Sequence, residues 1–216
     1  PGSTLLREFN LIKYNLGYTF FNLKDYPNAL SNLKTFETGG ANIKPEVLAD
    51  ARNRIADCYY IATSYTSAIA YYDKVIEFGN LDADYAMFQK GFSLGLINNT
   101  KGKIDVLTTL MQKFPSSPFV PNAIFERGRA YLVLEDFKKG EADFNTIISN
   151  YSGSSFVPRS IVQLGLLYYN LGDNEKAISE YKMVIENYKS TPEARDAMTG
   201  LRNTYVDLNE VDTYFT

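Results

Sequence analysis

Residues 163–181 read Gln-Leu-Gly-Leu-Leu-Tyr-Tyr-Asn-Leu-Gly-Asp-Asn-Glu-Lys-Ala-Ile-Ser-Glu-Tyr, and their spacing of small and large residues is the clearest structural signal in the chain. Gly165 is followed by Tyr168 three residues later, by Ala177 after twelve residues and by Tyr181 after sixteen. Steps of three and four residues place side chains on one face of a helix. The stretch therefore predicts two amphipathic helices, which cross closely at the small residues and are separated by a polar turn at residues 171–174.

The same spacing recurs along the chain. The small residues are Gly17, Ala56, Gly91, Gly128 and Gly165, and the large residues sixteen positions later are Leu33, Tyr72, Leu107, Phe144 and Tyr181. Successive small residues lie 39, 35, 37 and 37 positions apart, a period typical of stacked helical repeats. We expect an all-α chain in which residues 1–216 form a single domain. Its repeats are predicted at about 10–44, 49–83, 84–120, 121–157 and 158–194, with a partial sixth repeat at 195–216.

The repeats resemble the tetratricopeptide repeat (TPR) family, whose pattern runs Leu-Gly-x-x-Tyr, then Ala-x-x-x-Phe, then Pro. Residues 163–181 match this pattern closely, and the first repeat matches it through Asn15-Leu-Gly-Tyr-Thr-Phe20. The third repeat departs from it, because Lys90 and Lys103 stand where Leu and Ala are expected. The resemblance implies a right-handed α-solenoid of stacked helix-turn-helix repeats that acts as a protein-interaction scaffold.

The joins between the repeats add residues to the family's period of about 34. The join Tyr151-Ser-Gly-Ser-Ser-Phe-Val-Pro158 resembles those of a TPR subfamily found in bacterial envelope proteins. This resemblance favours a bacterial protein of the periplasm or cell envelope over a cytoplasmic one. The chain also begins without methionine and ends within an apolar pattern, so we expect a fragment of a longer protein.

The resemblance further implies which residues line the concave face. In TPR proteins the first helix of each repeat lines this face, at the positions three before, one after and four after the small residue. The partner-binding candidates at these positions are Tyr14, Tyr18, Asn53, Asp57, Tyr60, Phe88, Phe92, Phe125, Arg129, Leu166 and Tyr169. Because most are apolar or aromatic, we expect a protein or peptide partner to be held mainly by its apolar side chains.

Two alternatives for what covers this face stay open. An exposed apolar stripe usually marks an interaction site, which favours a groove that binds a segment of another protein. Alternatively, the chain fills the groove with its own side chains and serves as a structural spacer that positions other domains. Exposure of Tyr18, Phe88 and Phe92 to solvent would distinguish the two.

The composition argues against most other functions. The chain has no histidine and one cysteine, Cys58, so it lacks the usual general base and the commonest metal ligand. We therefore expect no catalytic residues, no metal and no cofactor, and we expect the protein not to be an enzyme. The net charge of -3 is not that of a nucleic-acid-binding protein. No apolar stretch approaches the ~20 residues of a transmembrane helix, so direct membrane insertion is not expected.

Overall fold

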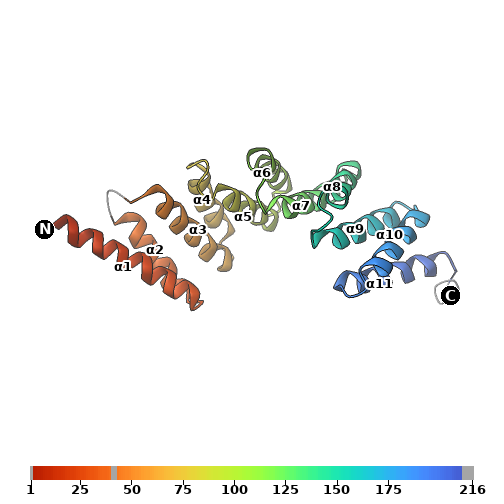
Figure 1. Ribbon diagram of the computed structural model, residues 1–216, viewed down its shortest axis with the longest axis horizontal. Helices are drawn as coiled ribbons and strands as arrows, with labels where there is room; N and C mark the ends of the chain where they lie inside the picture. The colour runs from red at the N-terminus through yellow and green to blue at the C-terminus, as the bar shows by residue number, and fades with distance from the viewer. Residues whose placement is uncertain (1, 40–42, 211–216) are drawn as a thin grey trace. The chain divides into compact units, whose positions relative to one another are not determined.

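The computed structural model describes residues 2–39 and 43–210, with side chains from residue 5, and this part of the chain forms eleven helices and no strand (Figure 1). The helices are α1 (Gly2–Asn22), α2 (Tyr26–Thr38), α3 (Pro45–Ile61), α4 (Tyr65–Ile76), α5 (Ala83–Leu96), α6 (Thr100–Lys113), α7 (Val120–Val133), α8 (Phe137–Asn150), α9 (Phe156–Asn170), α10 (Asn174–Asn187) and α11 (Pro192–Asp207). The predicted all-α repeat fold is confirmed. Helix α1 begins before the predicted boundary at residue 10, and the last part of the partial sixth repeat, residues 211–216, lies outside the described residues.

Contacts between helices divide the chain into two compact units, Pro1–Phe119 and Val120–Thr216. Unit 1 contains α1 to α6, and unit 2 contains α7 to α11. Within each unit every helix packs against the next helix in the chain, and α9 also packs against α11. Such nearest-neighbour stacking is the arrangement of a helical repeat. That residues 1–216 form a single domain stays a prediction.

Each helix pair crosses where its small residue meets the large residue sixteen positions later. A Cβ atom added to Gly17 on α1 would lie 2.5 Å from Cγ of Leu33 on α2. A Cβ atom added to Gly165 on α9 would lie 2.6 Å from Cε1 of Tyr181 on α10. Real Cβ atoms do not approach other atoms so closely, so these crossings need glycine for steric reasons. The spacing read from the sequence therefore corresponds to direct contacts between paired helices.

The turns within the pairs share one backbone conformation. Lys24, Thr63, Asn98 and Glu135 all have φ between 58° and 61°, and Gly172 has φ 77° at the matching place. In four of these five turns the next residue is Asp or Asn, and its side chain accepts a hydrogen bond from the backbone N–H three residues later. These capping residues are Asp25, Asn99, Asp136 and Asp173. The side chain satisfies one of the unpaired donors at the start of the second helix, so each turn both ends one helix and begins the next.

We expect Gly165→Ala to lower the free energy of unfolding by roughly 1 kcal/mol. Overpacking a core costs about 1–3 kcal/mol, and the better helix propensity of alanine returns at most about 1 kcal/mol. The Tyr181 ring has little room to move, because it also lies against Gly200 on α11. The control is Gly153→Ala, since nothing lies within 4 Å of a Cβ at Gly153. Equal denaturant midpoints for the two variants would contradict this account of the crossing.

We expect Thr63→Gly to raise the free energy of unfolding by roughly 0.5–1 kcal/mol. Thr63 is β-branched and has φ 58°, a region in which L-residues are strained and glycine is not. The matched control is Thr66→Gly, three residues later inside α4, where glycine should lower stability by a few tenths of a kcal/mol. Thermal melts of both variants test the prediction, which fails if Thr63→Gly also lowers the melting temperature.

Candidate functional site

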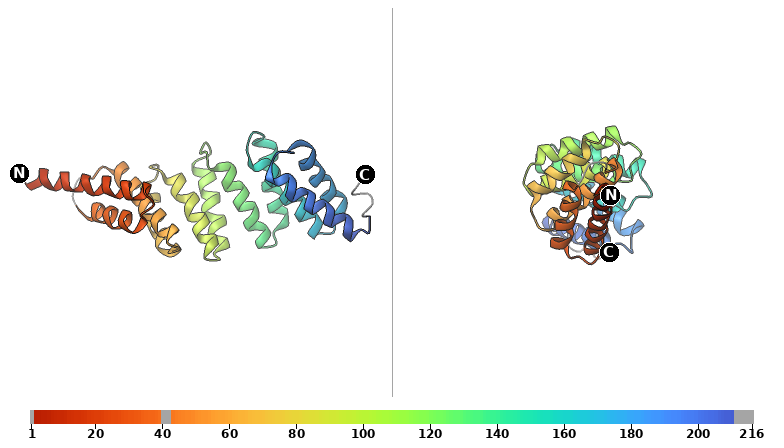
Figure 2. Two further views of the ribbon diagram at one scale, coloured as in Figure 1. Left: turned by 90° about the horizontal axis from the view of Figure 1, so that it is seen from below. Right: turned by 90° about the vertical axis from the view of Figure 1, so that its left-hand side faces the viewer.

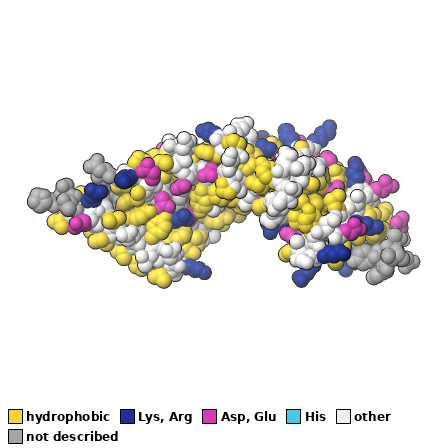
Figure 3. Space-filling view, viewed as in Figure 1, with side chains coloured by type: hydrophobic (Ala, Val, Ile, Leu, Met, Phe, Trp, Pro, Cys, Tyr) yellow, Lys and Arg dark blue, Asp and Glu magenta, His cyan; other side chains and the backbone are white. Residues whose placement is uncertain are grey.

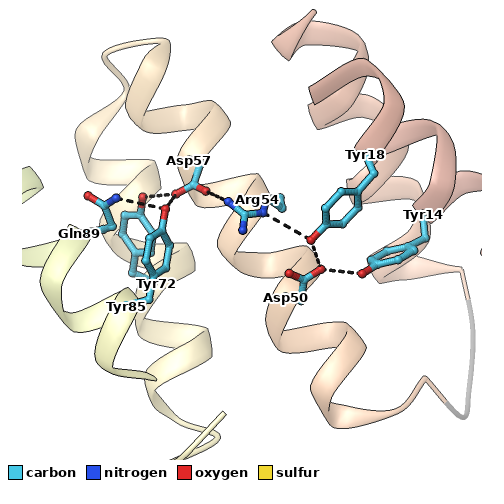
Figure 4. Close-up of polar contacts among 8 residues, drawn as sticks. All are labelled: Tyr14, Tyr18, Asp50, Arg54, Asp57, Tyr72, Tyr85 and Gln89. Carbon is cyan, nitrogen blue, oxygen red and sulfur yellow. Dashed lines mark hydrogen bonds and ion pairs between the residues drawn. The ribbon is translucent and has the colours of Figure 1, made fainter. Parts of the chain in front are cut away.

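In unit 1 a chain of polar contacts crosses the first helices of the first three repeats, α1, α3 and α5 (Figure 4). The hydroxyls of Tyr14 and Tyr18 on α1 both donate to Oδ2 of Asp50 on α3, with an O–O distance of 2.6 Å for Tyr14. The two tyrosine rings lie 5.0 Å apart between centroids. Burial, followed by the bond to Asp50, raises the pKa of the Tyr14 hydroxyl, so this group donates as a neutral phenol. The Asp50 carboxylate therefore joins α1 to α3.

Arg54 continues this chain along α3. Its Nη1 donates to Oδ2 of Asp57 over 2.8 Å, and its Nε donates to the Tyr18 hydroxyl over 3.4 Å. The guanidinium also lies 5.4 Å from the centroid of the Phe21 ring, within the range of a cation–π contact. Arg54 thus connects Tyr18, which bonds to Asp50, with Asp57 on α3.

Asp57 is the buried end of the chain of contacts. Its Oδ1 accepts hydrogen bonds of 2.8 Å from the hydroxyls of both Tyr72 and Tyr85, and Gln89 Nε2 donates to the Tyr85 hydroxyl over 3.1 Å. Burial raises the pKa of Asp57, although the two hydroxyls and Arg54 act to lower it. The folded protein therefore holds the Asp57 proton more tightly than the unfolded chain does. Ionisation of Asp57 consequently removes stability as the pH rises through that pKa.

Aromatic rings cover the neighbouring part of α5. Phe88 lies 5.0 Å from Phe92 and stacks on Phe119 at 5.1 Å, measured between ring centroids. Only 6% of Phe88 is exposed, whereas Phe92 is half-buried. Phe88 is therefore part of the core of unit 1.

Unit 2 contains an open groove of about 450 Å³ between the first helices of its repeats. It is lined by Phe125 and Arg129 of α7, by Arg159, Val162, Gln163 and Leu166 of α9, and by Glu193 and Asp196 of α11. Leu166 is 43% exposed, and Val162 is half-buried. Arg159 Nε lies 3.0 Å from Glu193 Oε1, so the two ends of this ion pair come from α9 and α11. The groove combines an apolar strip with both signs of charge.

The eleven predicted site residues fall into three groups by exposure. Arg129 and Leu166 are exposed, and Tyr14, Tyr18, Tyr60, Phe92 and Tyr169 are half-buried. Asn53, Asp57, Phe88 and Phe125 are buried, so at these four positions the face is filled by the chain's own side chains. The reason is packing against the chain itself: Phe125, for example, lies 5.8 Å from the Phe144 ring and 5.3 Å from the Phe156 ring. Buried Asn53 Oδ1 accepts no hydrogen bond within the described part of the chain.

Asp50, Arg54 and Tyr85 are among the side chains of this network that the sequence prediction missed. A signal for two of them was present. Asp50, Arg54 and Asp57 are separated by steps of four and three, which places them on one face of α3 with alternating charge. Tyr85 gave no such signal, because its contact with Asp57 depends on how α5 packs beside α3 and α4.

The remaining chemistry of the described residues is limited. Burial raises the pKa of the Cys58 thiol to about 12, so this thiol is neutral at physiological pH. Residues 2–39 and 43–210 contain no group of three or more Cys, Asp or Glu side chains that could hold a metal ion. In the same ranges, no helix is both long enough and apolar enough to span a bilayer.

Comparisons with known proteins agree with this fold. A tetratricopeptide repeat family model matches residues 159–191, and no curated protein matches the sequence. The structure is similar to that of a tetratricopeptide repeat protein from Parabacteroides merdae ATCC 43184, at 15% identity, 96% coverage of this chain, 77% of that chain and a TM-score of 0.78. It is also similar to PilW, a widely conserved type IV pilus biogenesis factor, at 15% identity, 95% and 90% coverage and a TM-score of 0.68. A third is YrrB, a TPR protein with an unusual peptide-binding site, at 14% identity, 87% and 90% coverage and a TM-score of 0.66. At these identities the likeness shows a shared TPR fold.

We expect Asp57→Ala to lower the free energy of unfolding by about 2–4 kcal/mol, because it leaves two tyrosine hydroxyls and a half-buried arginine without their acceptor. Tyr85→Phe is the matched control, since it removes one donor to Asp57 and the acceptor of Gln89 and should cost about 0.5–1.5 kcal/mol. Denaturant unfolding of the two variants measures both values. A cost for Asp57→Ala no larger than that for Tyr85→Phe would show that the network does not stabilise the fold.

Proposed function

We propose that this protein is a non-catalytic scaffold that binds a segment of another protein in the groove lined by α7, α9 and α11. The observation that carries the proposal is the apolar strip of exposed Leu166 and half-buried Val162, which lies between charged side chains. Apolar strips with a few convergent polar groups are the usual composition of binding sites. The shared fold supports the proposal, since YrrB, one of the similar structures, is described as having a peptide-binding site.

The charges of the groove limit what can bind there. Arg129 and Arg159 come from α7 and α9, while Glu193 and Asp196 come from α11. Because Arg159 and Glu193 already pair with each other, a segment with apolar side chains at its centre and charges at its ends would meet Arg129 at one end and Asp196 at the other. Because each partner charge would meet an opposite charge, the polar groups would fix the register of the segment while the apolar strip supplies affinity.

In unit 1 we propose a second contact surface along α1 and α3. Half-buried tyrosines offer apolar area with little loss of side-chain entropy on binding, which is why such residues are common in interfaces. The tyrosines of α1 are already held by Asp50, so binding would not need to order them. The proposed contact residues across both units are the accessible members of the predicted set: Tyr14, Tyr18, Tyr60, Phe92, Arg129, Leu166 and Tyr169.

The second candidate function is a structural spacer. It is favoured by the burial of Phe88 and by its stacking on Phe119, because this part of α5 is covered by the chain's own side chains. A spacer needs no open groove, so the accessible strip in unit 2 is the feature that favours the scaffold over the spacer.

We also propose a location in the bacterial periplasm or cell envelope. Support comes from the Ser-rich join at residues 151–158 and from the likeness to PilW, a type IV pilus biogenesis factor.

Selection from a library of displayed random peptides tests the scaffold function. We expect enriched peptides with central apolar residues, and we expect Leu166→Arg to weaken their affinity at least ~10-fold, or about 1.4 kcal/mol, because it places a charge on the apolar strip. The control is Leu171→Arg, which changes a leucine of similar exposure outside the groove and should leave the affinity unchanged. Peptides that bind wild type and Leu166→Arg equally well, or no enrichment at all, would favour the spacer.

A further inference from the structure

Helix α1 carries an apolar stripe that no described helix covers. Leu5, Phe9, Ile12 and Leu16 are all exposed, and Figure 3 shows hydrophobic side chains along this helix. The four residues follow one another by steps of four, three and four, so they lie on one face of α1. The opposite face of α1 packs on the rest of unit 1: Gly17 packs on Leu33 of α2, and Tyr14 and Tyr18 bond to Asp50 of α3.

The register of the repeats shows what this face does in the rest of the chain. Ile12 lies five residues before Gly17 and is 54% exposed. The residues at the same place in the later first helices are Ala51, Ala86, Ala123, Ser160 and Ala197, and all five are 0% exposed. Leu16 likewise corresponds to Ile55 and Leu164, which are buried. Ile12 is therefore exposed on α1, although its counterparts in the five later first helices are fully buried.

In unit 1 the residues at this buried position pack against the second helix of the preceding repeat. Ala51 and Ile55 of α3 form one core cluster with Leu33 and Phe36 of α2. In the same way, Ala86 of α5 clusters with Tyr72 and Val75 of α4. On α1 the equivalent face is apolar and open, so it is suited to another helix.

Two features of α1 argue against a helix packed as α2 packs on α3. First, α1 has Ile12 where α3 has Ala51, and the branched isoleucine side chain prevents an equally close approach of another helix. Second, α1 begins 15 residues before its small residue (17 − 2), whereas α3 begins 11 before (56 − 45) and α5 begins 8 before (91 − 83). The additional turns carry Leu5 and extend past the end of α2 in Figure 2.

The stripe instead has the spacing of a two-stranded coiled coil. Alternating steps of four and three are those of the a and d positions of a heptad, where large aliphatic residues of two helices interlock. Glu8 and Lys13 then fall at g and e positions on opposite sides of the stripe, five residues apart. In a parallel pair of identical helices, this is the spacing that brings Glu8 of one copy to Lys13 of the other.

The geometry points to a second copy of this chain as the occupant: two α1 helices pair in parallel through Leu5, Phe9, Ile12 and Leu16. A seam of two heptads is marginal for isolated peptides, since they must also form the helix. Here α1 is already folded against α2, so association does not have to order the helix. The dimer would present two binding grooves, and a partner with two matching segments would bind both with increased avidity.

The first test is the molar mass in solution. We expect wild type to be a dimer that dissociates on dilution, as measured by light scattering after size exclusion and by sedimentation. The double variant Ile12→Lys/Leu16→Lys should be a monomer at every concentration with an unchanged circular dichroism spectrum. The control is Val133→Lys, which places a lysine at an exposed apolar site of α7 and should remain a dimer. A monomeric wild type, or a double variant that still dimerises, overturns the proposal.

The second test uses the single buried cysteine. Because Cys58 is 1% exposed, an introduced cysteine is the only accessible thiol. In a parallel pair each residue of the stripe faces its own copy. We therefore expect a short bis-maleimide to link both Leu5→Cys and Leu16→Cys into covalent dimers, whereas Val133→Cys should form no covalent dimer, because this residue lies outside the stripe. Failure of either stripe variant to cross-link overturns the parallel pairing.

Discussion

The fold depends on the close crossing between the two helices of each repeat. Where Gly17 meets Leu33 or Gly165 meets Tyr181, there is no room for a further methyl group, so the distance between paired helices is set by the absence of a side chain. Because the repeats stack through these helix pairs, each close crossing also fixes how the first helix is rotated about its own axis. That rotation decides which residues of α3 or α9 reach the inner face and which reach the preceding helix.

The two units use their inner faces differently, although their repeats have the same register. In unit 1 tyrosine hydroxyls, Asp50, Arg54 and Asp57 satisfy one another, and this polar network ties three helices together. In unit 2 the corresponding face has separate contacts, such as Arg159 with Glu193 and the Tyr169 hydroxyl with Asp207, and it leaves Leu166 accessible beside Arg129. A satisfied polar network rigidifies a structure, whereas an accessible apolar strip gains free energy when a partner covers it. The same repeat therefore supports a rigid part and a binding part.

The helices, their pairing and the residues at their crossings could be predicted from the sequence, because each depends on spacing along one or two neighbouring helices. Gly128 and Phe144, for example, are linked by a spacing that recurs five times. The exposure of the inner residues could not be predicted in this way. Whether Phe88 is open or buried depends on Phe119, a residue in an irregular segment whose path no periodicity describes. The bonds of Asp57 to Tyr72 and Tyr85 likewise depend on the angle between three helices, which the pattern of a single helix does not contain.

The Tyr181 ring has a consequence for how unit 2 comes apart. The ring belongs to α10, yet it lies against Gly165 of α9 and Gly200 of α11, so one side chain occupies the space between three helices. Detaching α11 would expose one side of the ring to water and loosen the crossing of α9 with α10 at the same moment. These three helices would therefore open as one cooperative group, and their slowest amide protons would exchange with solvent at a common rate.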